Sequence, residues 1–323
     1  MTAPRRALAA LAALALLWSG MAHAAYPDRP ITVVVPNQAG GPLDLMARII
    51  AKTLPRYIGQ KVIVKNIVGG GTAVGDRAVL NAPADGYTFL FIHQPLMEVA
   101  AEGILGAKFT DFVPVARTGG IDQIYVARKG APFDSFKGMV DWGKDHPGGV
   151  RNGVALMANN HFVALAVTQA TGVKFKLINV PGGGGPILPA LLSDQIDVGF
   201  VAPEEVVAYA KTGKIVPLAL FGTQRNKLLP NLPTAKELGY PALGNLDVSA
   251  YWWARKDVPL QIRNTLADKL EQTMQDPELR KDFEHLTDDL GFTKGEALQH
   301  DVDARYAAYE KLVDTFNMRR AAK

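Results

Sequence analysis

The chain contains no cysteine, and this absence excludes several kinds of site at once. Without thiols there are no disulfides, no zinc–thiolate sites, no cysteine nucleophile and no cysteine for a lipid anchor at a signal cleavage site. An exported protein that lacks disulfides must be stabilised by a sizeable hydrophobic core. The chain of 323 residues is long enough for two domains of ordinary size.

A strong excess of charge of one sign is also missing. The formal net charge is only +4 at pH 7, and the basic residues are scattered along the chain. They form no stripe and are not interleaved with aromatic residues, as they are in proteins that bind nucleic acids. We therefore expect no nucleic-acid partner.

Recognised catalytic motifs are missing as well. The chain has no Gly-x-Ser-x-Gly elbow and no His-Glu-x-x-His, and its six histidines are dispersed. The pairs Glu204-Glu205 and Asp288-Asp289 are typical of solvated helix charges. We expect no enzymatic activity, no metal and no cofactor. The alternative is a secreted α/β hydrolase, whose possible nucleophiles and bases would be Ser249, Thr72, His93 and His161.

The first residues have the pattern of a secretory signal peptide. Arg5 and Arg6 form a positive segment, Ala7–Trp18 is almost purely apolar, and Ala22-His23-Ala24 is a cleavage site of small residues. We expect residues 1–24 to be removed before Ala25. No later segment approaches the length of a membrane span.

Segments with strand and helix patterns alternate along most of the remaining chain, which predicts an α/β fold with mostly parallel sheets. The expected strands are Ile31–Val35, Val62–Lys65, Thr88–Ile92, Ile124–Arg128, Gly153–Leu156, Lys174–Ile178, Ile196–Val201 and Ile215–Phe221. The expected helices are Leu43–Tyr57, Ser135–His146, His161–Ala170, Ile187–Ser193 and Glu204–Thr212.

From Pro259 to Lys323 the pattern predicts charged amphipathic helices without strands. We expect the chain to leave a first lobe near Asp122–Tyr125 and to return to it near Leu246–Ala250. This assigns residues 25–123 and 248–323 to the first lobe and residues 124–247 to the second. The two crossings predict a hinge, with the loops at the carboxyl ends of the strands facing a cleft.

The segment from Pro30 to Asp44 predicts a strand that runs through a glycine turn into a helix. The start of such a helix presents free backbone N–H groups and the positive end of the helix dipole, which suit a carboxylate or phosphate. An ordinary strand–helix connection is the alternative.

Three further loops place small residues before helix starts. In Asn66–Gly75, Asp76 and Arg77 stand where a phosphate loop needs Lys and Ser or Thr, so we exclude nucleotide binding. Asn159 and Asn160 are expected to cap the following helix, and one of the two amides could point into the cleft. The glycine run 182–185 supplies backbone amides or a mobile connection.

These loops and several other short motifs make the chain resemble the TctC or Bug type of substrate-binding protein of tripartite tricarboxylate transporters. The resemblance covers essentially the whole chain after residue 24. It rests on Tyr26–Thr32, Pro36–Asp44 with Arg48, Asn66–Gly71, Pro83–Thr88, His161, Gly183–Pro186, Leu232–Pro241, and Trp253 followed by Pro259.

The resemblance implies a two-lobed periplasmic binding protein, or Venus flytrap, in the periplasm. In this family a ligand carboxylate is held by backbone amides of the first two loops while the second lobe closes over the ligand. The receptor, expected to be a monomer, delivers a small organic acid to the membrane permease subunits of a tripartite transporter. Service to a sensor system is an alternative.

The chain departs from the family pattern at Asn37, Thr72, Met157-Ala158, Pro181-Gly182 and Val201. The second lobe thereby loses a hydroxyl, a phenol and a cation, so we expect a carboxylate with an apolar or aromatic body. We expect the ligand to contact Asn37, Gln38, Ala39, Gly40, Gly41, Gly70, Gly71, Thr72, His93 and Gln94 of the first lobe and Ala158, Asn159, Gly182, Gly183 and Pro203 of the second.

Overall fold

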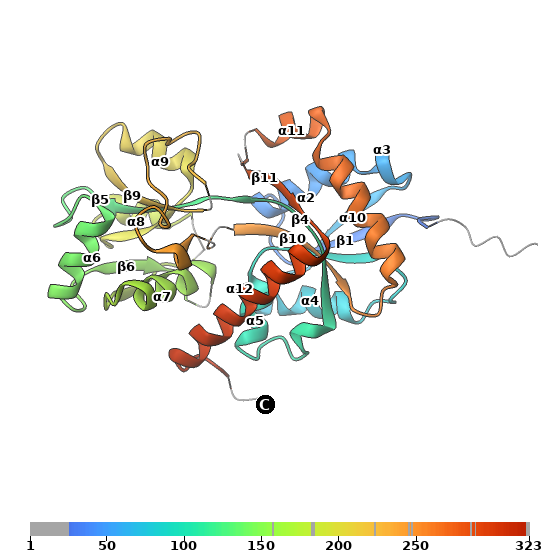
Figure 1. Cartoon of the computed structure of the whole chain (residues 1–323), viewed down its shortest axis with the longest axis horizontal. Helices are drawn as coiled ribbons and strands as arrows, with labels where there is room; N and C mark the ends of the chain where they lie inside the picture. Colours follow the sequence, from blue (N-terminus) through green and yellow to red (C-terminus); the bar gives the residue numbers. More distant parts are fainter. Residues whose placement is uncertain are drawn as a thin grey trace, which may run out of the picture.

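The computed structural model describes residues 26–156, 158–181, 185–222, 224–244, 246, 248–284, 286–287 and 289–320. These residues form two lobes, each with one β-sheet that has helices packed against it (Figure 1). The predicted two-lobed α/β architecture is confirmed. The predicted signal peptide lies outside the described residues.

The sheet of the first lobe has six strands, three of which follow one another early in the chain. Their β-branched and aromatic residues suit a sheet buried on both faces. In spatial order the strands are β11 (Asp289–Thr293), β4 (Phe112–Ile121), β10 (Val248–Arg255), β3 (Thr88–Ile92), β1 (Ile31–Val35) and β2 (Val62–Asn66).

The sheet of the second lobe has five strands, all from the middle of the chain. Their spatial order is β7 (Lys176–Asn179), β6 (Arg151–Val154), β8 (Val198–Val201), β5 (Gln123–Arg128) and β9 (Ile215–Phe221).

Both sheets are mixed: most strands in each run in one direction, and each sheet contains reversed strands. In the first sheet β10 and β11 run against the others, and in the second sheet β5 does. Neighbouring pairs are therefore a mixture of parallel and antiparallel. The reversed strands β5 and β10 are the ones with which the chain enters the second lobe and returns to the first.

The two crossings between the sheets differ in length. Only Asp122 separates β4 from β5, whereas residues 222–247 connect β9 to β10. Gln123, which the predicted division places in the first lobe, pairs with Phe221 in the second sheet.

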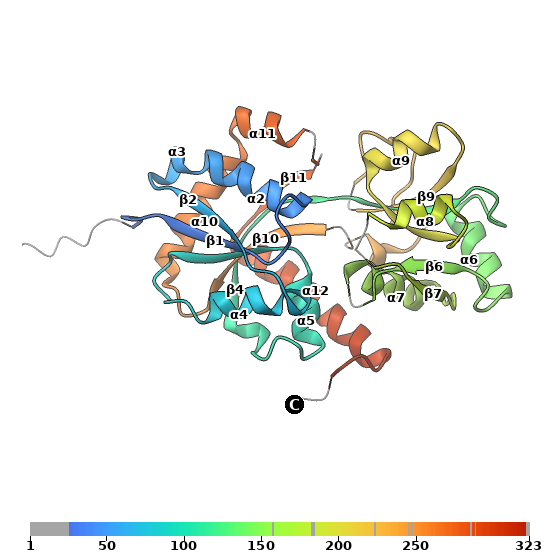
Figure 2. The same ribbon diagram turned by 180° about the vertical axis from the view of Figure 1, so that it is seen from behind.

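Helices pack on both faces of the first sheet (Figures 1 and 2). In one group α2 (Pro42–Thr53) contacts β2, and α10 (Leu260–Met274) contacts β4 and β11. The other two helices of this group, α3 (Pro55–Ile58) and α11 (Pro277–Phe283), pack against α2 and α10. The other group, with two short 3-10 turns, is η1 (Gly70–Thr72), α4 (Ala73–Leu80), α5 (Pro95–Ala101), η2 (Phe109–Asp111) and α12 (Gly295–Thr315).

The second sheet also has two apolar faces, and β5 alternates between them. Tyr125 and Ala127 lie in one buried cluster, and Ile124 and Val126 in another. Such alternation is what a strand covered on both sides requires. The helices are α6 (Phe136–Asp145) and α7 (Asn159–Thr171) on the first cluster and α8 (Ile187–Leu192) and α9 (Pro203–Ala210) on the second; the turn η3 (Pro241–Leu243) precedes the return.

The prediction that no strand follows Pro259 is wrong, because β11 lies between α11 and α12. This strand is half-buried at the edge of the sheet and is defined by its pairing with β4. The strand β4 was not predicted either, since Pro114, Gly119 and Gly120 interrupt its apolar pattern. In both cases tertiary pairing decides the structure where the local pattern is weak.

The C-terminal helix α12 belongs to the first lobe but reaches the second lobe (Figures 1 and 2). Tyr309 of α12 packs edge-on against Phe162 of α7, with 5.4 Å between ring centroids. Phe162 and Leu165 are buried in the same cluster as the core of the first lobe. The lobes are thus joined by apolar contacts as well as by the chain crossings. None of the helices among the described residues has both the length and the apolar character to cross a membrane.

Candidate functional site

The first predicted loop, residues 36–41, connects β1 to α2 and is shaped by the buried carboxylate of Asp44. Its Oδ2 accepts hydrogen bonds from the Gly40 N–H (2.8 Å) and from Arg48 Nε (2.8 Å). Its Oδ1 accepts one from Asn66 Nδ2 (2.9 Å), which also donates to the Asn37 carbonyl (3.1 Å). Burial acts to raise the pKa of Asp44, but the hydrogen bonds from Arg48, Gly40 and Asn66 hold it below its usual value. The loop is therefore held in shape by the protein itself.

This network changes which amides of the first loop can bind an anion. The Gly40 N–H donates to Asp44, so this amide is not one of the free N–H groups expected in the loop. The Gly41 N–H points to the Gln38 carbonyl at 3.4 Å. Gln38 and Ala39 are exposed, and their N–H groups have no acceptor among the described residues. The N–H groups that remain available to an anion are thus those of Gln38 and Ala39, in the loop before the first residue of α2, Pro42.

The second predicted loop contains Gly70, Gly71 and Thr72, with φ angles of +58°, +69° and +118°. A positive φ is unusual for a β-branched residue, so the backbone at Thr72 is strained. The Thr72 hydroxyl donates to Asp76 Oδ2 at 2.8 Å and is buried, so it does not face solvent as a ligand contact would. Gly70 and Gly71 are exposed, and their N–H groups have no acceptor in the described part of the chain.

The two loops and helix α5 pack against one another. A side chain at Gly75 would place its Cβ 2.6 Å from the Ile67 carbonyl and 2.7 Å from Pro36 Cβ, so only glycine allows this approach. A Cβ at Gly71 would lie 3.4 Å from Val99 of α5. The exposed amides of the first and second loops therefore belong to neighbouring segments at the carboxyl ends of β1 and β2.

His93 and Gln94 follow β3, as predicted, and precede α5, a helix that was not predicted, but both are directed inward. Gln94 is almost fully buried. The His93 Nδ1 atom is buried with no hydrogen-bond partner among the described residues. Burial lowers the pKa of His93 to about 4, so its ring is neutral at pH 7.

Glu98 of α5 was not one of the predicted ligand contacts, although its hydrogen-bond partner Asn159 was. Its side chain is only 2% exposed, and Oε1 accepts a hydrogen bond from Asn159 Nδ2 of the second lobe at 3.2 Å. Burial raises the pKa of Glu98 to about 8. The signal in the sequence was a lone acid within the apolar stretch 95–101, because a charged residue in such a stretch is rarely buried without a reason.

In the second lobe, the start of α7 carries the predicted residues Ala158 and Asn159. The Ala158 N–H is bound to the Ala155 carbonyl at 3.0 Å, and Ala158 caps α7 without a side-chain bond. Asn160 Oδ1 accepts the Ala155 N–H, while the Asn159 amide reaches Glu98 in the first lobe. The Asn159 amide thus lies in a buried contact between the lobes, whereas the expectation that Asn159 and Asn160 cap α7 is wrong, because Ala158 is the N-cap. Gly182 and Gly183 lie outside the described residues.

Pro203 begins α9 and is buried beside the crossing between the lobes. It lines a narrow gap with Ile121, Asp122, Asn226, Leu286 and Thr287. No other predicted contact residue lines this gap, so the structure does not bring Pro203 together with the two amide loops.

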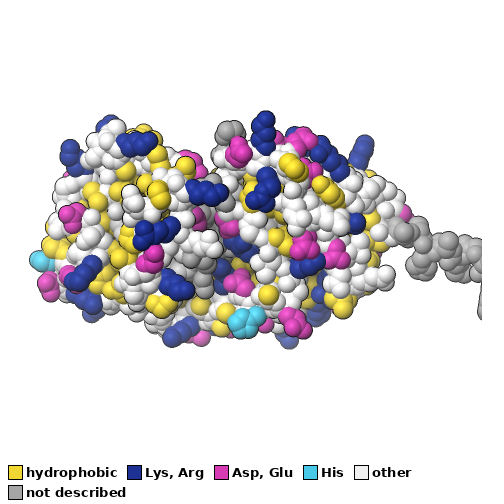
Figure 3. All heavy atoms as spheres, turned by 45° about the horizontal axis from the view of Figure 1, so that its top comes forward, with side chains coloured by type: hydrophobic (Ala, Val, Ile, Leu, Met, Phe, Trp, Pro, Cys, Tyr) yellow, Lys and Arg dark blue, Asp and Glu magenta, His cyan; other side chains and the backbone are white. Residues whose placement is uncertain are grey.

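A cavity of about 640 Å³ lies between the lobes at a third place, and the predicted residues do not line it. Its wall includes five basic and three acidic side chains from both lobes. They are Arg117, Arg225, Lys227, Arg280, Arg305, Asp122, Asp289 and Asp301. Figure 3 shows the furrow between the lobes with Lys and Arg side chains along it. Arg117 is paired with Asp289, Arg225 with Glu237 and Arg305 with Asp301. We name this space the rear cavity.

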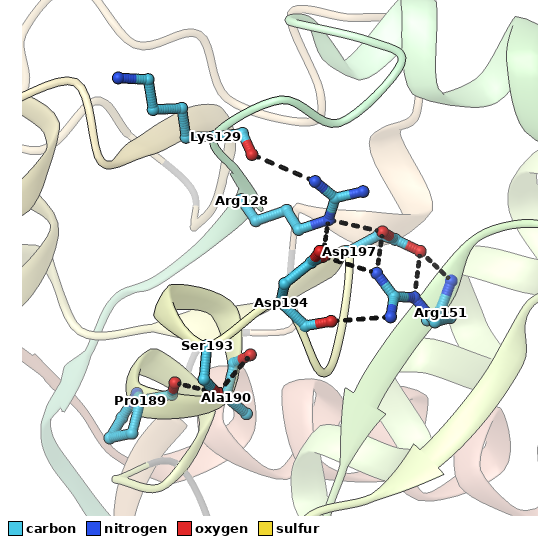
Figure 4. A network of polar contacts seen from close by, with 8 residues as sticks. All are labelled: Arg128, Lys129, Arg151, Pro189, Ala190, Ser193, Asp194 and Asp197. Atoms are coloured by element: carbon cyan, nitrogen blue, oxygen red, sulfur yellow. Dashed lines mark hydrogen bonds and ion pairs between the residues drawn. The ribbon is translucent and has the colours of Figure 1, made fainter.

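A second charged network, drawn in Figure 4, lies in the second lobe, where strand β6 begins at Arg151. The buried carboxylate of Asp197 accepts hydrogen bonds from Arg128 Nε (2.8 Å), Arg151 Nη2 (2.8 Å) and the Arg151 N–H (2.8 Å). Asp194 joins both arginines. Arg128 ends β5, so this network lies at the end of the strand away from the crossing. Its geometry is that of a structural clamp between strands.

The arrangement gives no support to a hydrolase. The Thr72 hydroxyl is bound to Asp76, and Ser249 Oγ accepts from Arg117 Nε at 2.8 Å. The described residues also contain no group of three His, Asp or Glu side chains that could hold a metal ion.

Comparison with known proteins matches residues 46–300 to the model of the tripartite tricarboxylate transporter family receptor, TctC. Protein BugT of Bordetella pertussis is 30% identical over 234 residues, which cover 71% of this chain and 70% of that protein. A TctC solute-binding protein from Polaromonas has a similar structure, with 29% identity, a TM-score of 0.77, and coverage of 90% and 99% of the two chains.

Two structures from Rhodopseudomonas palustris are similar in fold alone, at 24% identity each. MatC with bound malate has a TM-score of 0.69 and covers 89% of this chain and 100% of its own. The protein with adipate has a TM-score of 0.70 and covers 90% and 98%.

Proposed function

Because the chain belongs to the family of tripartite tricarboxylate transporter receptors, the TctC or Bug type of periplasmic solute-binding protein, we propose that it captures one small organic carboxylate between its lobes and delivers it to a membrane permease. The family consists of receptors and not of enzymes. The division into lobes at residues 123 and 248, secretion by residues 1–24 and action as a monomer are parts of this proposal.

The observation that carries the proposal is the set of exposed amides at the carboxyl ends of β1 and β2. Gln38, Ala39, Gly70 and Gly71 present N–H groups without acceptors in the described part of the chain, on loops that pack side by side. Backbone amides that point outward from helix starts are suited to a carboxylate. The proposed ligand contacts of the first lobe are these four residues, with Asn37 and Gly41 beside them. The other proposed contacts are His93, Gln94 and Thr72 of the first lobe and Ala158 and Asn159 of the second.

The mechanism we propose is a shift between open and closed lobes. A ligand that touches both lobes only in the closed form favours that form. A reversal from 1:99 to 99:1 requires about 5.5 kcal/mol. Hydrogen bonds from amides to a charged group contribute about 1.5–3 kcal/mol each, so three or four amides suffice.

An apolar or aromatic body of the ligand is the finer part of the proposal. Val68 and Val74 flank the second loop, and Leu156 lies two residues before Ala158. All three are large apolar side chains with more than two fifths of their surface exposed: 52%, 42% and 51%. Apolar surface beside anion donors suits an acid with a hydrocarbon body.

The test is calorimetric titration with citrate, malate, adipate, benzoate and glutamate, using the wild type and Gly40→Val. Gly40 has φ +83° and open space around its Cβ position, so valine strains the first loop without a clash. Gly59→Val is the matched control, because Gly59 has φ +79° and equally open space at the end of α3. Both variants are expected to lose about 1–2 kcal/mol of stability.

We expect Gly40→Val to weaken binding of the preferred acid at least tenfold and Gly59→Val to leave it unchanged. Equal affinities of the two variants would place the anion elsewhere. Recovery of the acid unchanged after incubation separates a receptor from a hydrolase. Loss of its uptake in cells that lack the protein separates transport from sensing.

A further inference from the structure

Glu98 and Asn159 form a side-chain hydrogen bond between the lobes. Glu98 lies on α5 of the first lobe and Asn159 in the first turn of α7 of the second. Asn159 Nδ2 donates to Glu98 Oε1 at 3.2 Å, and the two residues are 2% and 8% exposed. A bond that is buried where two lobes meet forms or breaks with their contact.

The charge state of Glu98 matters for this bond, because a carboxyl group can donate a hydrogen bond only when it is protonated. Ionised, Glu98 is an acceptor only; neutral, it carries one O–H donor. Asn159 Oδ1 is buried and lacks a donor among the described residues. A neutral Glu98 can therefore satisfy both ends of the Asn159 amide, while an ionised one leaves a buried charge with a single amide donor.

The surroundings of Glu98 favour its neutral form. Burial raises the pKa of Glu98 to about 8, Glu102 one turn later raises it further, and the Asn159 bond lowers it. The other elements packed against α5 carry few groups that titrate near neutral pH. Asp76 and Arg77 lie on α4, and Asp111 lies on η2 with Lys108 before it. The charged or titratable groups of α12 are Glu296, His300, Asp301, Asp303, Arg305, Tyr306, Tyr309, Glu310, Lys311 and Asp314, and η1 has none. After α12, the Arg320 N–H donates to the Glu102 carbonyl and the charge of Arg320 lowers the pKa of Glu102, and His161 lies on α7 of the second lobe. No cation among the described residues is hydrogen-bonded to the Glu98 carboxyl.

We propose that Glu98 is a specificity-determining residue that contacts Asn159 as a neutral acid, so that lobe closure takes up one proton and disfavours ligands with an ammonium group. The part that concerns ligands rests on the proposed receptor function. The part that concerns closure does not. A carboxylate ligand meets no repulsion from a neutral Glu98, and an amino acid meets no counter-charge for its ammonium group.

The direction of the pH dependence follows from linkage. Burial in this contact raises the Glu98 pKa from 4.5 to about 8, so in the proposal exposure of the group on separation of the lobes lowers the pKa towards 4.5. The contact is therefore fully favourable below about pH 4.5 and loses strength as the pH rises towards 8. In that range the ratio of closed to open molecules falls by up to about tenfold per pH unit, and above it the ratio is constant.

The experiment uses the lack of cysteine, since two introduced cysteines can be labelled specifically. Lys65→Cys on β2 and Lys211→Cys after α9 place exposed labels on the two lobes. Energy transfer between the dyes, in full-length protein without ligand, reports closure from pH 6.5 to 9. Burial lowers the pKa of His161 from its ordinary value of 6.5, so this ring remains neutral in the window.

Two variants accompany this measurement. Glu98→Gln keeps an acceptor and a donor for Asn159 but cannot ionise. Glu102→Gln is the matched control: Glu102 caps the C-terminal end of the same helix and is 1% exposed, and burial raises its pKa to about 7, but no side-chain hydrogen bond among the described residues joins it to the second lobe. We expect wild type and Glu102→Gln to open as the pH rises to 8, and Glu98→Gln to stay closed. Closure that is independent of pH in the wild type, or lost equally in both variants, overturns the proposal.

The ligand part is tested with glutarate and glutamate, which differ by the ammonium group. We expect the wild type at pH 7 to bind glutarate at least tenfold more tightly than glutamate. If Glu98→Gln selectively loses glutamate binding, Glu98 is an ionised partner for ammonium and the proposal is wrong. If neither acid binds while closure still depends on Glu98, the choice of ligand fails and the proton-dependent contact stands.

Discussion

Three buried carboxyl groups of the first lobe and one of the second are held in opposite ways. In the first lobe, burial raises the pKa of Asp76, Glu98 and Glu102 to about 7, 8 and 7. None of the three has a hydrogen bond from a cationic side chain among the described residues. In the second lobe, burial also acts to raise the pKa of Asp197, but hydrogen bonds from Arg151 and Arg128 hold it below its usual value.

The difference follows the position of these groups relative to the proposed site. Asp197 links Arg128 at the end of β5 to Arg151 at the start of β6, away from the crossing between the lobes. Asp76 and Glu98 lie beside the exposed amides, where unpaired acids destabilise the fold. Groups that oppose stability tend to be found where a protein binds its ligand. Asp44 of the first lobe differs from these acids, because hydrogen bonds hold it ionised and its carboxylate fixes the shape of the first loop.

The largest effect is expected from breaking the clamp of the second lobe. Asp197→Asn removes the charge between Arg128 and Arg151 and should lower the free energy of unfolding by about 3 kcal/mol. Asp194→Asn is the control, because that side chain is 68% exposed and its ion pairs are worth less than about 1 kcal/mol. Urea unfolding at pH 7 measures both.

Neither variant of the clamp should change the affinity for the preferred acid. A change in affinity with Asp197→Asn would show that the clamp and the proposed site are coupled. Since the pKa of Asp197 is lowered from 3.8, its contribution to wild-type stability should persist at neutral pH and disappear only as the pH falls below that value.

A smaller effect of opposite sign is expected for Asp76 of the first lobe. Its pKa is raised from 3.8 to about 7, so its ionisation destabilises the fold as the pH rises between these values. Asp76→Asn keeps an acceptor for the Thr72 hydroxyl and removes the charge. It should stabilise the protein by about 2 kcal/mol at pH 8 and leave it unchanged at pH 4.

Asp44→Asn is the control for this prediction in the same lobe. Because hydrogen bonds hold the pKa of Asp44 low, its neutralisation should destabilise the protein at pH 8. Urea unfolding at the two pH values compares the variants. A destabilised Asp76→Asn at pH 8 would mean that the Asp76 charge is satisfied and that the contrast between the lobes is smaller than inferred.

Much of the fold could be predicted because the strands that carry it have strong local patterns. Ile31–Val35, Thr88–Ile92 and Ile215–Phe221 have the predicted bounds, since each is an apolar run between turn residues. The strands β4 and β11 depend on pairing across the sheet, and a pairing between residues 120 and 289 leaves no local signal.

The proposed site was predictable as loops but not as hydrogen bonds. A glycine turn before a helix indicates where amides lie, and Gln38–Ala39 and Gly70–Gly71 do carry the exposed N–H groups. That Asp44 would take the Gly40 amide depends on a side-chain rotamer, which no pattern of residues encodes. The contact between Glu98 and Asn159 depends on the docking of two lobes, which the sequence of either lobe does not determine.

The smallest effect is expected at the rear cavity, which tests whether the crossing strands act as a hinge. In the order of the first sheet, β11 lies on one side of β4 and β10, and β1 and β2 lie on the other. The rear cavity and the amide loops thus flank the crossing strands, so that approach of the lobes at one opens the other.

Lys227 has no acidic partner among the described residues, and Arg280 Nη1 donates to the carbonyl of Met274. Both residues line the rear cavity, one from each lobe, so their like charges oppose approach of the lobes there. Neutralising both charges in the double variant Lys227→Gln with Arg280→Gln should let the lobes approach each other at the rear cavity. Binding of the preferred acid should then weaken about twofold at low salt. In 0.5 M sodium chloride this difference should disappear, because salt at that concentration screens exposed charges over distances well below about 10 Å. Calorimetric titration at the two salt concentrations measures it, and tighter binding by the double variant would place the axis of closure elsewhere than between β4 and β10.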